Sequence, residues 1–156
     1  MNLTRRDTAA TMAAILLSPT AAFSRAMKDL KLLRIPGVQA FAYRDESTQP
    51  LNQATTQLAD AFNARGAGQS VDGETLAADA TTSNEQIAQS VDAALGKEWK
   101  RSTGFTSANP HIHLLVWERA TAPKRFYAIA AFDAVHTATA DGRKYRPLES
   151  VFTRER

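Results

Sequence analysis

The amino-acid sequence predicts an α+β domain in which two amphipathic helices pack on one face of an antiparallel sheet that ends in a three-strand meander. Two segments carry apolar residues at three- and four-residue spacing. Later segments are rich in β-branched and aromatic residues, with a turn signal between one and the next. The chain has 156 residues, of which 44% are hydrophobic and 22% charged, so we expect one folded domain.

The first element is predicted to be a cleaved export signal at residues 1–24. Arg5 and Arg6 precede an apolar run at residues 9–17, and small residues close the segment. This order of charge, apolar run and small residues is typical of export signals. A nine-residue helix spans about 13 Å, well short of the ~30 Å core of a bilayer, so no membrane span is predicted. We expect the domain at residues 25–156 to be periplasmic or secreted.

The route of export has two interpretations. Thr4, Arg5 and Arg6 resemble the start of a twin-arginine signal, although Thr8 stands where that pattern has a large apolar residue. The alternative is an ordinary secretion signal that happens to carry two arginines. The chain has no cysteine, which excludes disulfides, thiolate catalysis, cysteine-ligated zinc and a lipid anchor on cysteine.

The first half of the domain is predicted to hold a strand, a helix and a loop. Residues 38–44 alternate as a strand does, after a Pro-Gly turn. A helix over 51–65, ended by Gly66, carries an apolar stripe made of Leu51, Ala54, Leu58, Ala61 and Phe62. Residues 66–82 contain three glycines among small polar residues and are predicted to be a Gly-rich loop with a helical turn near 75–78.

A second helix is predicted at about 84–101. Ser83 and Gln86 have the spacing of a capping box at its start. Apolar residues then follow four apart, at Ile87, Val91, Leu95 and Trp99. Gly96 inside this span weakens the helix by about 1 kcal/mol relative to Ala.

The last third of the chain predicts the meander. Its three strands are read from "HIHLLVWER", "RFYAIAAFDAVHT" and "KYRPLESVFTR". A loop with Pro123 and a turn at Asp141-Gly142 separate them. Pro147 cannot donate a ladder hydrogen bond, so the third strand is expected at a sheet edge or with a bulge.

Charge is uneven along the domain. Residues 25–96 carry six Lys/Arg and nine Asp/Glu, whereas residues 97–156 carry eleven and six. The basic half could bind an acidic protein or small molecule, or it could simply protect sheet edges from pairing. The net charge of +3 is too small to indicate a nucleic-acid partner.

Two of the three histidines, His111 and His113, share one face of a predicted strand. If Arg119 pairs with Arg125 across the hairpin, His111 lies opposite Asp133. Two imidazoles and one carboxylate can bind a divalent transition metal such as Zn²⁺ or Cu²⁺. The alternative is a pair of ordinary polar residues at a strand end, with no cofactor at all.

Trp117 and Tyr127 fall on the same face as His113 in this register. They are candidates for stacking on a ligand, although aromatic residues in strands are also common in cores. The helices are expected on the other face of the sheet, which carries Ile112, Leu114, Val116, Phe126 and Phe132.

Two functions remain open from the sequence. The first is a small exported binding or accessory domain without catalysis, which uses an exposed sheet face or the basic edge. The second is an exported enzyme, metal-dependent or acid–base, centred on His111, His113 and Asp133. The chain lacks the spacing of a dinucleotide loop, a P-loop or a serine nucleophile elbow, which favours the binding domain.

Overall fold

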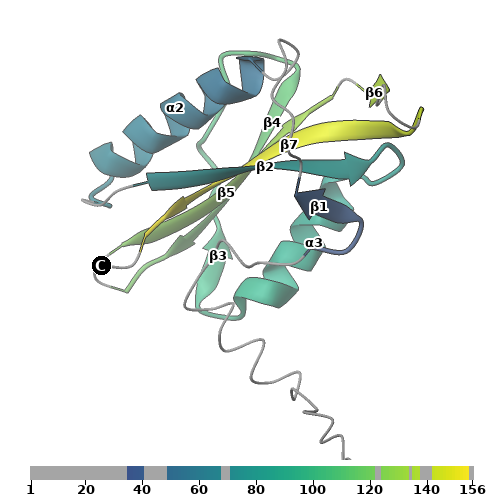
Figure 1. Ribbon diagram of the computed structural model, residues 1–156. Coiled ribbons are helices and arrows are strands. Elements are labelled where there is room, and N and C mark those ends of the chain that lie inside the picture. The colour runs from purple at the N-terminus through teal and green to yellow at the C-terminus, as the bar shows by residue number, and fades with distance from the viewer. Residues whose placement is uncertain are drawn as a thin grey trace, which may run out of the picture.

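The computed structural model describes residues 35–40, 49–67, 71–121, 124–133, 135–137 and 142–154 (Figure 1). The predicted export signal, with Arg5 and Arg6, lies outside the described residues. No helix in the described ranges is long and apolar enough to cross a membrane. The elements in chain order are β1 (Val38–Ala40), α2 (Gln49–Ala64), β2 (Val71–Asp79), α3 (Asn84–Leu95), β3 (Trp99–Arg101), β4 (Ile112–Arg119), β5 (Arg125–Phe132), β6 (His136–Thr137) and β7 (Lys144–Thr153).

The strands form one antiparallel sheet in the order β1-β2-β7-β5-β4-β3, and the short β6 pairs with β7 outside this path. The α+β class is therefore confirmed, and β4, β5 and β7 form the predicted meander, with β6 added before its last strand. The sheet is strongly twisted, so that its strands cross between the two helices in Figure 1.

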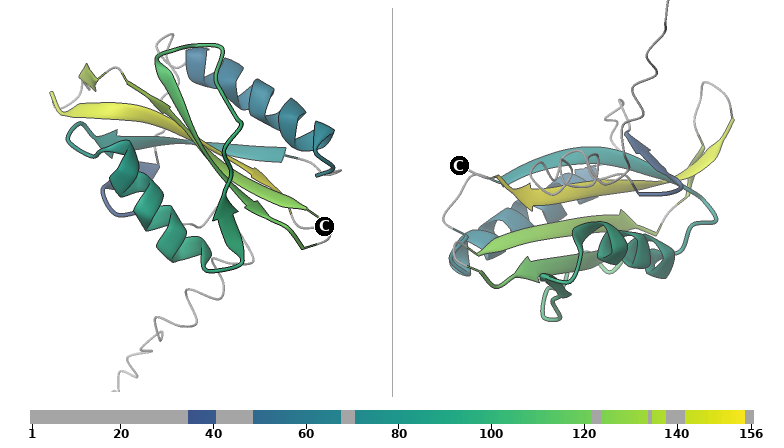
Figure 2. Two further views of the ribbon diagram at one scale, coloured as in Figure 1. Left: turned by 180° about the vertical axis from the view of Figure 1, so that it is seen from behind. Right: turned by 90° about the horizontal axis from the view of Figure 1, so that it is seen from below.

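The two helices lie on opposite faces of this sheet, and not on one face as the sequence predicted (Figures 1 and 2). Helix α3 packs against the face that carries Trp117, Tyr127 and Ile129. Helix α2 packs against the face that carries Val116 and Phe126. The reason lies in β5, which is buried at every position from Arg125 to Ala131. A strand that is apolar on both faces needs a cover on each.

Helix α2 follows the predicted stripe closely. Its buried residues are Leu51, Ala54, Leu58 and Phe62. At its end the amide of Ala67 donates to the carbonyl of Phe62 at 3.0 Å, and the amide of Gly66 donates to the carbonyl of Asn63 at 3.1 Å. Gly66 has a φ of +87°, which a glycine adopts without strain. These are the bonds of a Schellman motif, so Gly66 ends the helix as predicted.

Helix α3 begins as predicted and ends earlier. The Ser83 hydroxyl accepts from the amide of Gln86, and the Gln86 side chain accepts from the amide of Ser83, which completes the capping box. The helix ends at Leu95 because Gly96 leaves helical geometry with a φ of +82°. The prediction of a helix to residue 101 is therefore wrong. Trp99 lies on the edge strand β3, although it is buried as expected.

The Gly-rich loop predicted at 66–82 is wrong for residues 71–79, which form β2. This strand pairs along its whole length with β7 and, at Leu76–Ala78, also with β1. Its sequence consists mainly of small and acidic residues, with Val71 and Thr75 as its β-branched residues and no aromatic residue. Pairing with neighbours on both sides overrides that weak preference.

Strand β7 lies between β2 and β5 and is not the edge strand that Pro147 suggested. Pro147 is paired with Ala77 of β2, whereas the ladder with β5 ends at Leu148. The proline thus has a strand partner on one side only. This position lets an inner strand accept a residue that cannot donate, because no β5 residue lies opposite it in the ladder.

Candidate functional site

The hairpin of β4 and β5 sets the geometry of every predicted site residue. Arg119 pairs with Arg125 and His113 with Ala131, so the register assumed from the sequence is confirmed. Just beyond the hairpin ladder, the amide of Asp133 donates to the carbonyl of His111 at 2.9 Å. His111 and Asp133 are therefore opposite each other, as predicted.

His113 and Asp133 form a pair at this end of the sheet. The Nε2 of His113 lies 2.8 Å from Oδ1 of Asp133, and about half of each side chain is exposed. A carboxylate at this distance accepts a hydrogen bond from the imidazole and orients the ring. The pair could therefore move a proton at the surface.

The third predicted metal ligand does not join this pair. His111 is an exposed turn residue, and its backbone amide donates to Oδ1 of Asn109 at 2.9 Å. Within the described ranges, no three His, Cys, Asp or Glu side chains stand close enough together to hold a metal ion. The described residues thus bring together two of the three predicted ligands, and the Zn²⁺ or Cu²⁺ site stays a prediction.

Trp117 and Tyr127 are core residues beneath α3. Each is 1% exposed, and their ring centroids are 6.0 Å apart. The indole Nε1 of Trp117 donates to Oδ1 of Asp92 on α3 at 2.6 Å. Burial, with a smaller effect of the charge on Glu74, raises the pKa of the Tyr127 hydroxyl above its usual range. Neither ring offers a surface for stacking on a ligand, so the predicted ligand-binding role is not supported.

Asp92 also belongs to a charged cluster that the sequence did not reveal. The guanidinium of Arg101 on β3 donates to Asp92, with Nε 2.9 Å from Oδ2, and to Glu85, with Nη1 3.2 Å from Oε2. Hydrogen bonds from Arg101 hold the pKa values of both carboxyls below their usual range. The cluster fastens α3 to the strands under it.

Basic side chains gather at the opposite end of the sheet from His113. We call this group the basic end and define it by Lys100, Arg119, Lys124, Arg125 and Arg154. Arg119 and Arg125 are direct cross-strand partners. Arg154 follows the last residue of β7, where the continued register lies opposite Arg125. Arg119 and Arg125 indicate the register from the sequence, but nothing in the sequence pattern shows that basic side chains gather at this end of the sheet.

Two acidic side chains offset part of this charge. Arg154 pairs with Asp72 at 2.6 Å, and Lys124 pairs with Glu118 at 3.3 Å. Arg125 is only 2% exposed and donates from Nη2 to the carbonyl of Thr153 at 3.2 Å. The basic end therefore contains two cations in ion pairs, Lys124 and Arg154, and one deeply buried guanidinium, that of Arg125.

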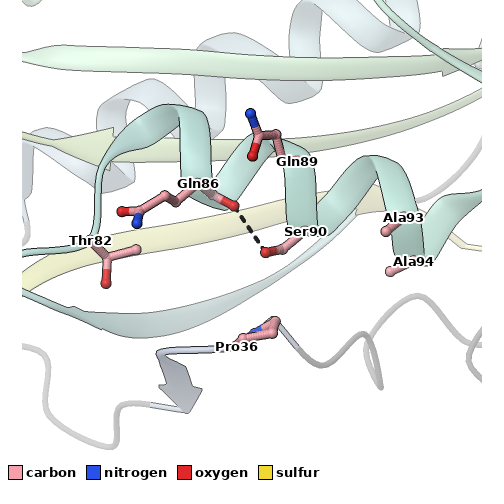
Figure 3. A pocket seen from close by; sticks show the side chains of 7 residues that line it. All are labelled: Pro36, Thr82, Gln86, Gln89, Ser90, Ala93 and Ala94. Atoms are coloured by element: carbon pink, nitrogen blue, oxygen red, sulfur yellow. Dashed lines mark hydrogen bonds between the residues drawn. The ribbon is translucent and has the colours of Figure 1, made fainter.

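A separate pocket of about 620 Å³ lies beside α3 (Figure 3). Among the described residues, its lining is made of Pro36, Thr82, Gln86, Gln89, Ser90, Ala93 and Ala94. None of these side chains titrates. The polar ones are engaged locally, since the Ser90 hydroxyl donates to the carbonyl of Gln86 at 2.9 Å and Gln89 donates to Glu85 at 3.2 Å. The pocket offers no group for acid–base or nucleophilic chemistry.

Comparison of the chain with protein-family models, with curated proteins and with solved structures finds no match.

Proposed function

We propose that this protein is an exported binding or accessory domain without catalysis, and that it binds an acidic partner at the basic end. The observation that carries the proposal is the cross-strand row of Arg119, Arg125 and Arg154 at one end of β4, β5 and β7. Guanidinium groups gathered at one end of a sheet favour a partner that carries negative charge.

The distribution of charge supports the same surface. Residues 97–156 carry eleven Lys/Arg against six Asp/Glu, and this segment supplies every member of the basic end. Lys100 and Lys124 are exposed at the same end of the sheet, on the face opposite to that of Arg119 and Arg125. A surface of one sign attracts an oppositely charged partner over about a Debye length, which speeds encounter.

Binding of poly-L-glutamate by the full-length chain tests this function. We expect binding at low ionic strength that weakens steadily as salt is added, because exposed charges are screened. Poly-L-lysine of the same length is the matched control and should not bind. Absence of poly-L-glutamate binding, or binding that salt leaves unchanged, would contradict the proposal.

Export is tested separately. The segment with Arg5 and Arg6 motivates the expectation that the protein leaves the cytoplasm and loses residues 1–24. Intact-mass measurement of the protein recovered from its own cells should give the mass of residues 25–156. A full-length chain in the cytoplasm would refute export. Replacement of both arginines by lysine distinguishes the routes, because the twin-arginine pathway depends on them.

The second candidate function is an acid–base enzyme, which the His113–Asp133 pair favours. In that case Asp133 holds the imidazole, and Nδ1 of His113 takes or gives the proton. The full-length chain should then turn over a member of an ester, amide and phosphoester panel, and His113→Ala should abolish the turnover. A rate that is the same in His113→Ala excludes this function.

A further inference from the structure

We infer that the basic end contains a carboxylate-binding subsite centred on Arg119, with Trp99 as its aromatic wall. This inference rests on the proposed function and names the chemical group that the surface recognises. Arg119 is the last residue of β4, directly between Trp99 of β3 and Arg125 of β5. It therefore has a cross-strand partner on each side at the basic end of the sheet.

The guanidinium of Arg119 differs from the other arginines that surround the sheet. Arg101 pairs with Asp92 and Glu85, Arg146 donates to Thr82 and Asn84, and Arg154 pairs with Asp72. Within the described ranges, the Arg119 side chain makes no hydrogen bond and no ion pair. Its Nε is buried and has no acceptor. A guanidinium carries five N–H donors, and the four on the Nη atoms of Arg119 have no acceptor among the described residues, so a carboxylate from outside the chain can accept from them.

Trp99 holds this guanidinium in place. The Cζ of Arg119 lies 5.9 Å from the centroid of the Trp99 ring, within the range of a cation–π contact. Trp99 is itself 7% exposed and belongs to the core under α3, so the wall is rigid. A pre-positioned guanidinium loses little entropy when it binds an anion.

The neighbouring carboxylates leave Arg119 to an external group. Glu118 points to the other face of β4, as its place in the strand requires, and pairs with Lys124. Glu98 is exposed in the turn before Trp99, and among the described residues no ion pair joins it to Arg119. A planar guanidinium edge matches the two oxygens of one carboxylate, which favours an acidic side chain or a chain terminus over a phosphate.

A peptide titration tests the subsite in the full-length chain. The probe is a hexaglutamate peptide, hexaglutamine is the uncharged control, and inorganic phosphate is a separate arm. Binding is followed by NMR through the side-chain Nε–H signal of Arg119, assigned by its absence in Arg119→Lys. We expect hexaglutamate to shift this signal, and phosphate at the same charge concentration to shift it much less.

Two variants separate the subsite from simple charge attraction. Arg119→Lys keeps the charge but loses the planar edge, and we expect its affinity for hexaglutamate to fall about tenfold. Lys144→Gln removes one exposed charge at the other end of β7 and should change affinity less than about twofold. If Arg119→Lys and Lys144→Gln bind hexaglutamate with the same affinity, or if phosphate shifts the Arg119 signal as strongly as hexaglutamate does, the carboxylate subsite is wrong. The proposed surface for an acidic partner is not contradicted by that result. If the wild-type chain binds no hexaglutamate, the subsite and the proposed function both fail.

Discussion

The two faces of the sheet are covered by different kinds of interaction. On the α2 face, Phe62 stacks on Phe126 of β5 with centroids 4.7 Å apart, and Phe105 meets both rings edge-on. On the α3 face, apolar packing is joined by the hydrogen bond from Trp117 to Asp92 and the ion pairs of Arg101. One helix is held mainly by aromatic contact, and the other is also tied by polar contacts.

This difference explains why the sequence predicted the correct face of the sheet for α2 and the wrong face for α3. An apolar stripe reports that a helix has a buried side, and it fits any apolar surface of the right width. Polar contacts have direction and fix one position. Asp92, Arg101 and Trp117 come from three different elements, so their meeting depends on the fold and leaves no periodic signal in the sequence.

The largest effect should come from the aromatic side. Phe62 is fully buried, and Phe62→Ala removes its ring from the stack on Phe126. We expect a loss of about 3–5 kcal/mol in the free energy of unfolding, measured by urea denaturation. Gln57→Ala, on the exposed side of the same helix, is the control and should stay within about 0.5 kcal/mol of the wild type. A small change in Phe62→Ala would mean that α2 is not held by this stack.

A smaller loss is expected on the α3 side. Asp92→Ala leaves the indole N–H of buried Trp117 without its acceptor and Arg101 without its closest carboxylate. An unsatisfied buried donor costs about 1–3 kcal/mol. Asp92→Asn, which can still accept from the indole, should recover part of the loss. Equal losses of stability in Asp92→Ala and Asp92→Asn would show that the hydrogen bond from Trp117 contributes nothing and that the whole effect comes from the charge of Asp92.

The ion pairs of the α3 side predict a dependence on pH that the α2 side lacks. Arg101 lowers the pKa values of Asp92 and Glu85 in the folded protein. A carboxyl group with a lowered pKa stabilises the fold above its unfolded pKa, and the contribution is lost as the pH falls through its folded pKa. The ordinary values are 3.8 for Asp92 and 4.5 for Glu85, so the loss begins as the pH falls below them.

Arg101→Gln makes this dependence measurable. The stability difference between wild type and Arg101→Gln should be present at pH 7 and should shrink as the pH is lowered below the ordinary pKa values of the two carboxyls and they take up protons. Phe62→Ala serves as the reference, because its loss involves no titrating group and should change little with pH. A stability difference for Arg101→Gln that is constant over this range would rule out the ion pairs as its source.

The sequence was informative where a pattern is local. The stripe of α2, the capping box of Ser83 and the register of β4 on β5 all depend on residues within one element or one hairpin. That register also brought His113 and Asp133 together correctly. The predictions failed where distant elements decide the outcome. Examples are β2, whose small residues become a strand through pairing with β7, and Trp117, which is covered by a helix 25 positions earlier in the chain.

The smallest expected effect completes the comparison, because it concerns Arg65, the residue that directly follows α2. Arg65 lies outside the end of α2, with its Cζ 4.0 Å from the centroid of the Phe105 ring, and its Nη2 donates weakly to the carbonyl of Gly104 at 3.4 Å. A cation–π contact at an exposed position contributes about 0.5–1 kcal/mol. A double-mutant cycle with Arg65→Gln, Phe105→Leu and the combined variant isolates this coupling from the apolar packing of Phe105 on Phe62. We expect a coupling energy of that size, retained in part by Arg65→Lys, which keeps the charge. A coupling energy of zero would show that the α2 side depends on aromatic packing alone.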